Sequence, residues 1–133
     1  MNDDVNRAVR EWLSKAEGDW ETVQILAAHP VPPLNSLCFH CQQFAEKLLK
    51  AFLTLHGIEA PRTHSLRRLI QLAESHLPGI SKLADASDRL TVHAVDTRYP
   101  GAPLLITREQ AQSLIELAGT FRERLLPVLL PDQ

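Results

Sequence analysis

The side chains best suited to chemistry in this sequence lie on one polar stripe near its centre. They are spaced by three, four, three and four positions: His40, Gln43, Lys47, Lys50 and Thr54. On a helix this spacing places them on one face, where an imidazole, an amide and two ammonium groups could bind a phosphate-bearing ligand. Glu46 lies one helical turn before Lys50 and can pair with it. The alternative is a solvated helix face without a ligand, because polar helix faces are common.

A long helix must position this polar stripe. Apolar residues recur beside it at helical spacing: Leu37, Cys41, Phe44, Leu48, Phe52 and Leu55. This apolar stripe is wide, which is typical of a central helix that several others pack against. We expect the helix to end at His56-Gly57, where glycine supplies a left-handed terminal residue. Cys38 and Cys41 lie on the buried side, and a lone Cys-x-x-Cys predicts reduced thiols rather than a metal site.

Three more helices are expected from the apolar spacing before residue 96. The first covers residues 5–28, is capped by Asn2 or Asp3, and is ended by the proline-rich stretch 29–33. Thr63 can cap another helix that continues to Leu77, where Pro78-Gly79 breaks it. A shorter helix follows over residues 81–95.

The last helix has a clear start signal. Thr107 and Gln110 are spaced as a capping box. Pro127 and Pro131 are expected to end this helix and to leave a short apolar tail, residues 128–130. No strand-like alternation of apolar and polar residues is present, so the sequence predicts one all-α domain over residues 1–133.

Composition narrows the class of protein. A chain of 133 residues with 44% hydrophobic residues can bury one core without disulfides or metals. The formal net charge of −2 is no general signature of nucleic-acid binding, but residues 47–68 hold five bases against Glu59 alone, which predicts a local basic patch. The sequence starts without a basic segment leading into an apolar run, and no stretch approaches about 18 apolar residues. We therefore expect a cytoplasmic protein with no membrane partner.

Four separated segments resemble a known family. They are Trp12-Leu13-x-x-Ala16-Glu17-x-Asp19-Trp20, the run of residues 38–51, Pro61-Arg62-Thr63-His64-Ser65-Leu66, and Thr97-Arg98-Tyr99-Pro100. In order and spacing they resemble the HEPN domain family over nearly the whole chain. The run 38–51 is the most specific segment, because it matches in consecutive polar as well as apolar positions.

The HEPN resemblance implies a fold and a set of partners. The fold it implies is an antiparallel four- to five-helix up-and-down bundle, usually a homodimer. Members are often encoded beside a minimal nucleotidyltransferase in toxin-antitoxin-like two-protein systems, and a cleft is associated with nucleotides or RNA. The sequence holds no Gly-rich phosphate loop, no paired metal-ligand spacing and no nucleophile elbow, so we expect no cofactor and no metal.

The ligand-binding residues are predicted from the polar stripe together with the resembling segments. They are His40, Gln43, Lys47, Lys50, His64, Arg98 and Tyr99. Arg98 and Tyr99 lie in a proline-bounded turn that can hold a guanidinium and a phenol against the central helix. For His64 the alternative is a hydrogen bond at a helix terminus.

The ribonuclease branch of the family is marked by an arginine, four to six intervening residues and a histidine. Arg89 and His93, the nearest candidates, have only three residues between them. In a metal-independent ribonuclease the histidine would exchange a proton with a ribose 2′-hydroxyl, and the arginine would stabilise the phosphorane charge. The alternative is a surface pair without a catalytic role. Asp96 follows closely and would keep His93 charged, so we expect no strong ribonuclease activity from the isolated protein.

Three functions therefore stay open. The first is a dimeric nucleotide-binding and partner-binding component of a system with a minimal nucleotidyltransferase. The second is a ribonuclease toxin that uses Arg89 and His93, and the third is a helical dimerisation scaffold without ligand chemistry. The apolar tail at Val128, Leu129 and Leu130 favours a homodimer, because exposed apolar side chains prefer a partner.

Overall fold

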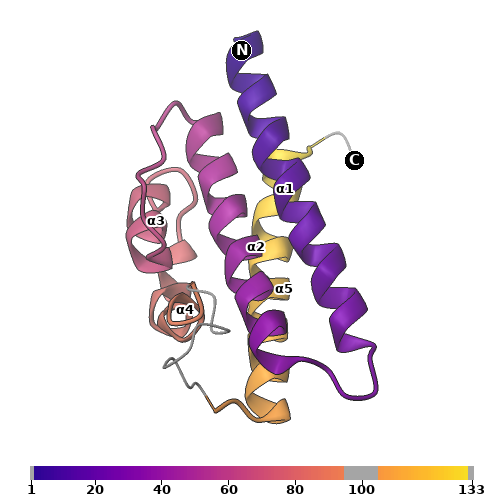
Figure 1. The fold of residues 1–133 in the computed structure, drawn as a ribbon. Helices are drawn as coiled ribbons and strands as arrows, with labels where there is room; N and C mark the ends of the chain where they lie inside the picture. The colour runs from indigo at the N-terminus through magenta and orange to yellow at the C-terminus, as the bar shows by residue number, and fades with distance from the viewer. Residues whose placement is uncertain (1, 95–104, 132–133) are drawn as a thin grey trace.

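Five α-helices and one 3₁₀ turn build the part of the chain that the structure describes (Figure 1). The computed structural model describes residues 2–94 and 105–131. In chain order the elements are α1 (Asp3–Ala27), α2 (Leu34–Leu55), α3 (Leu66–Ala73), the 3₁₀ turn η1 (Ile80–Leu83), α4 (Ala84–Thr91) and α5 (Arg108–Leu129). The predicted all-α bundle is confirmed, and these described residues contain no strand. None of the described helices is long and apolar enough to cross a membrane.

α2 lies at the centre of the bundle, as its wide apolar stripe predicts. It contacts α1, α5, α3 and α4. Figure 1 shows α1 on one side of α2, α3 and α4 on the other, and α5 behind. Because α3, η1 and α4 together return the chain to the start of α5, α5 runs in the same direction as α2.

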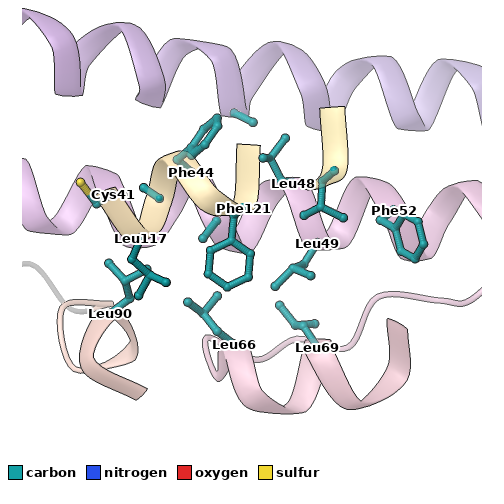
Figure 2. Close-up of a cluster of buried hydrophobic side chains, with 14 of the residues drawn as sticks. Cys41, Phe44, Leu48, Leu49, Phe52, Leu66, Leu69, Leu90, Leu117 and Phe121 are labelled. Carbon is teal, nitrogen blue, oxygen red and sulfur yellow. The ribbon is translucent and has the colours of Figure 1, made fainter. Parts of the chain in front are cut away.

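The core forms where the apolar stripes of these helices meet. Phe44, Leu48 and Leu49 of α2 and Phe121 of α5 are fully buried there (Figure 2), and the Phe44 ring packs against Trp20 of α1. Burying a side chain of this size contributes about 1.5–3 kcal/mol each. Cys38 and Cys41 are buried free thiols, as predicted. Burial raises the pKa of Cys38 to about 11 and raises that of Cys41 further, so both thiols stay protonated and inert at neutral pH.

The predicted helix starts are partly confirmed. Asn2 caps α1, with its Oδ1 accepting from the Asp4 backbone N–H at 2.7 Å. Ser65, not Thr63, caps α3 by accepting from the Arg68 N–H at 3.3 Å. The Thr63 hydroxyl accepts from the Ser65 N–H at 3.1 Å instead, so it orders the turn before the cap.

The two short helices end earlier than the apolar spacing predicts. α3 stops at Ala73 rather than Leu77, because the Glu74 carboxylate accepts from the N–H groups of Gly79 at 3.0 Å and Ser81 at 2.8 Å. These bonds close a turn in place of another helical turn. α4 stops at Thr91 rather than residue 95, and His93 follows it in a turn.

Pro127 does not end α5, contrary to the prediction. The helix continues to Leu129 with Pro127 inside it. Proline removes only the one N–H that would bond the carbonyl four residues earlier, and this position is in the last turn. Leu129 is buried in the core, and Leu130 packs against it. The expectation of a free apolar tail at residues 128–130 is therefore wrong.

The capping box at the start of α5 gives the first prediction. The Thr107 hydroxyl accepts from the Gln110 N–H at 3.1 Å, and the Gln110 side chain accepts from the Thr107 N–H at 3.0 Å. Replacing Thr107 with alanine should lower the free energy of unfolding by about 1 kcal/mol, whereas Thr107→Ser should retain most of it. Urea denaturation of both variants is the measurement, and equal stability of the two would contradict this role.

Candidate functional site

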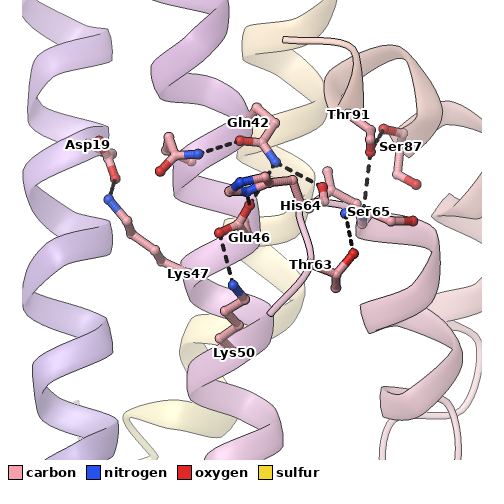
Figure 3. Close-up of polar contacts among 12 residues, drawn as sticks. Asp19, Gln42, Glu46, Lys47, Lys50, Thr63, His64, Ser65, Ser87 and Thr91 are labelled. Atoms are coloured by element: carbon pink, nitrogen blue, oxygen red, sulfur yellow. Dashed lines mark hydrogen bonds and ion pairs between the residues drawn. The ribbon is translucent and has the colours of Figure 1, made fainter. Parts of the chain in front are cut away.

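The polar stripe of α2 is divided between two ion-pair clusters rather than left open to solvent. The first cluster joins α2 to α1 through Asp19, which is buried. Its Oδ2 accepts from Lys47 Nζ at 2.6 Å and its Oδ1 lies 2.8 Å from His40 Nδ1. Figure 3 shows the Asp19–Lys47 pair spanning the two helices. A buried carboxylate needs such partners, because desolvation opposes its charge.

The second cluster joins α2 to the connector that leads to α3. Glu46 is buried and accepts from Lys50 Nζ at 3.1 Å and from Gln42 Nε2 at 3.1 Å, while His64 Nδ1 lies 2.8 Å from it (Figure 3). Gln42 also donates to the His64 carbonyl at 3.2 Å. Burial would raise the pKa of Glu46, but the bonds from His64 and Gln42 and the charge of Lys50 outweigh it and lower this pKa. Glu46 therefore stays ionised at neutral pH.

These contacts change the interpretation of the predicted ligand-binding residues. Lys50 is only 7% exposed and is committed to Glu46, so the expectation of an exposed lysine there is wrong. Lys47 and His40 are half-buried beside Asp19, and Gln43 donates to Gln42 at 2.7 Å. The two carboxylates neutralise the lysine charges, so the α2 stripe offers phosphate less attraction than its sequence indicates.

The predicted basic patch over residues 47–68 is also largely neutralised. Arg67 of α3 pairs with Asp85 at 2.7 Å and with Asp88 at 2.8 Å on α4. Hydrogen bonds from Arg67 lower the pKa of Asp88. Arg62 and Arg68 remain exposed on the surface. The patch is therefore mainly a set of links between elements.

A pocket with a volume of about 660 Å³ lies between α4 and α5, and it brings Arg89 and His93 together. It is hereafter called the α4–α5 pocket. Its wall is made of side chains from both helices and from the residues just before α5: Asp88, Arg89, Val92, His93, Leu105, Ile106, Glu109, Gln110, Ser113 and Leu114. The guanidinium of Arg89 donates to the Ser113 hydroxyl at 3.0 Å. The pocket therefore combines one cation with a largely apolar wall.

His93 is the buried polar group of this pocket. His93 is only 6% exposed, and its Nδ1 has no hydrogen-bond partner among the described residues. Burial lowers the pKa of His93, so the imidazole is neutral at neutral pH. This effect of burial opposes the charged state that was expected from Asp96. Asp96, Arg98 and Tyr99 lie outside the described residues.

Comparison with family models decides what kind of domain this is. The model of the HEPN domain matches residues 9–128. The chain belongs to the HEPN domain family. Comparisons with curated proteins and with solved structures gave no match. Among the described residues of this HEPN domain, no group of three or more histidine, cysteine, aspartate or glutamate side chains could hold a metal ion.

Two important residues of this HEPN domain were not predicted as part of a site. Asp19 falls on the apolar stripe of α1, between Ala16 and Val23, which are both fully buried. An acid at such a position requires a cationic partner, and this signal is readable from helical spacing. Ser113 carries no such signal, because only the packing of α5 against α4 brings its hydroxyl to Arg89.

The ion-pair clusters of the HEPN domain predict unequal roles for its two central lysines. Lys50→Gln should lower the free energy of unfolding by about 1–3 kcal/mol, because it leaves the buried Glu46 without its cation. Lys47→Gln should cost less, because Lys47 is more exposed and Asp19 keeps His40. Urea denaturation measures both values. Two variants as stable as the wild type would show that both lysines lie on a solvated face.

Proposed function

We propose that this HEPN domain is a nucleotide-binding and partner-binding component of a two-protein system with a minimal nucleotidyltransferase, of the toxin-antitoxin type. The observation that carries the proposal is the α4–α5 pocket, where the guanidinium of Arg89 borders apolar side chains. Small-molecule sites typically combine an apolar wall with a few placed polar groups. The base of a nucleotide would lie against Val92, Ile106 and Leu114, and its phosphates would face Arg89.

Charges around the pocket support this orientation of the ligand. Asp88, beside Arg89, is held by Arg67 at 2.8 Å and shares this arginine with Asp85, so its charge is partly compensated. Glu109 is exposed on the α5 side and would repel phosphate there. A phosphate group is therefore better placed on the α4 side, within reach of Arg89. His40, Gln43 and Lys47 of the α2 stripe and His64 of the connector stay predicted ligand contacts, with less net charge than expected.

Nucleotide titration of a matched pair of variants tests this function. Arg89→Gln should weaken binding of ADP or ATP by about tenfold or more, because a hydrogen bond to a charged group contributes about 1.5–3 kcal/mol. The control is Arg7→Gln, since Arg7 is exposed on α1 and pairs only weakly with Asp4 at 3.7 Å. Isothermal titration calorimetry gives both affinities. Equal affinity of the Arg89→Gln variant and the wild type would exclude the pocket as the nucleotide site. If the wild type binds no nucleotide at all, the dimerisation scaffold is the function that remains.

Ribonuclease activity is the second candidate function, because Arg89 and His93 line the same pocket. A neutral imidazole is in the correct state to accept the proton of a ribose 2′-hydroxyl, after which the oxygen would attack the adjacent phosphate. The unpartnered Nδ1 of His93, however, is shielded from solvent. A 2′-hydroxyl cannot reach that nitrogen without movement of the surrounding side chains.

We therefore expect no strong ribonuclease activity from the isolated protein. Single-stranded RNA incubated with it in the presence of a chelator should stay intact over hours, and His93→Ala should behave like the wild type. Gel electrophoresis of end-labelled RNA is the measurement. Cleavage that persists without metal and disappears in His93→Ala would establish the ribonuclease function instead.

A homodimer is part of the proposal, although its contact surface differs from the one expected. The apolar side chains that remain exposed near the pocket are Val92, at 59%, and Leu105, at 95%. Exposed apolar side chains next to a pocket favour a protein contact there. Light scattering at micromolar concentration should give about twice the chain mass of 14.9 kDa. A mass of one chain would contradict the dimer, and Leu105→Ser should shift the mass towards one chain.

A further inference from the structure

Two histidine rings stack where α2 ends against the turn that follows α3. The ring centroids of His56 and His76 are 4.3 Å apart, and the planes are inclined by 20°. His56 also contacts Phe52, with ring centroids 4.5 Å apart. His56 thus contacts both an aromatic ring of α2 and an imidazole twenty residues later in the chain. These contacts fasten the turn, residues 74–79, to the end of α2.

We propose that the stacked rings of His56 and His76 form an acid-sensitive latch that holds this turn against α2. The turn leads into η1 and α4, and α4 with the turn after it brings Arg89 and His93 to the α4–α5 pocket. The latch is closed when His56 is neutral and opens when His56 is charged. It is a property of the fold that does not depend on which ligand the pocket binds.

Hydrogen bonding makes the closed latch incompatible with a charged His56. Its Nε2 is buried and has no hydrogen-bond partner in the described part of the chain. A protonated imidazole carries a donor on each ring nitrogen, so a charged His56 would hold one buried donor without an acceptor. Two charged imidazoles at this stacking distance would also repel each other.

The electrostatic surroundings favour the neutral form of His56. A helix C-terminus attracts positive charge, and His56 caps α2. Burial of the ring nevertheless lowers its pKa, and the charge of His76 lowers it further. The charged groups on the neighbouring elements are Glu74 in the turn and Arg124 on α5. Glu74 is bonded to Gly79 and Ser81, and Arg124 donates to the Pro78 carbonyl at 3.5 Å.

The direction of the pH effect follows from the lowered pKa. Above about pH 6.5 His56 is neutral whether the latch is open or closed, so protonation does not shift the equilibrium between the open and closed forms. As the pH falls below 6.5, the open form binds the proton more readily than the closed form. The latch therefore weakens below that value, until the pH passes the lower pKa of the closed form.

Hydrogen exchange measured by NMR tests the latch in the intact protein. The amides of Leu77 and Ile80 bond to the carbonyls of Ala73 and Leu77 at 3.0 Å and 3.2 Å. Their protection factors, which remove the intrinsic pH dependence of exchange, should fall between pH 7.5 and pH 5.5. At pH 5.5, one unit below the ordinary pKa of 6.5, the expected fall is at most about tenfold. Amides in the middle of α1 should not change.

Variants that keep an aromatic ring at the stack, but one that cannot be protonated, complete the test. In His56→Phe an aromatic ring that cannot be protonated replaces the imidazole next to Phe52. Protection at Leu77 and Ile80 should therefore become independent of pH. His76→Phe keeps His56, whose burial is the larger cause of its lowered pKa, so protection should still fall with pH but by less than in the wild type. His29→Asn, in the exposed turn after α1, is the control and should retain the wild-type loss. Protection that is independent of pH in the wild type would overturn the latch, and so would an unchanged loss in His56→Phe.

Discussion

Two buried carboxylates hold the rest of the structure in place. Asp19 fixes α1 to α2 through Lys47 and His40, and Glu46 fixes the connector to α2 through His64 and Lys50. Each acid lies deeper than its histidine partner, so the carboxylates act from inside the bundle. A central helix packed on nearly every side has few positions for free charges. Its polar side chains are therefore neutralised by neighbours that the fold supplies.

This neutralisation moves the best candidate for ligand binding away from α2. A lysine paired to a buried carboxylate has less attraction for a phosphate, because the net charge of the pair is close to zero. Arg89 lies in different surroundings, since its contact is a neutral hydroxyl and its neighbour Asp88 is held by Arg67. The apolar wall of the α4–α5 pocket adds the surface that a base would need. The short helices α3 and α4 thus matter because they position this pocket.

Helical spacing explains why so much of the fold was predictable. Apolar residues at spacings of three and four predicted the long helices, and the capping box at Thr107 fixed the start of α5. The errors came from competing local bonds. Glu74 ends α3 early by accepting from Gly79 and Ser81, and Ser65 replaces Thr63 as the cap. Pro127 remains within α5 because the core contact of Leu129 continues the helix beyond it.

The sequence by itself determined the family, the all-α fold and the position of Glu46 one turn before Lys50, because these depend on spacing along one chain segment. Only the tertiary structure decided that Asp19 meets Lys47 and His40, which are more than twenty residues away, and that Ser113 meets Arg89. It also placed His93 where burial lowers its pKa. Such contacts and desolvation depend on how separate helices pack, and no local spacing encodes the distance between two helices.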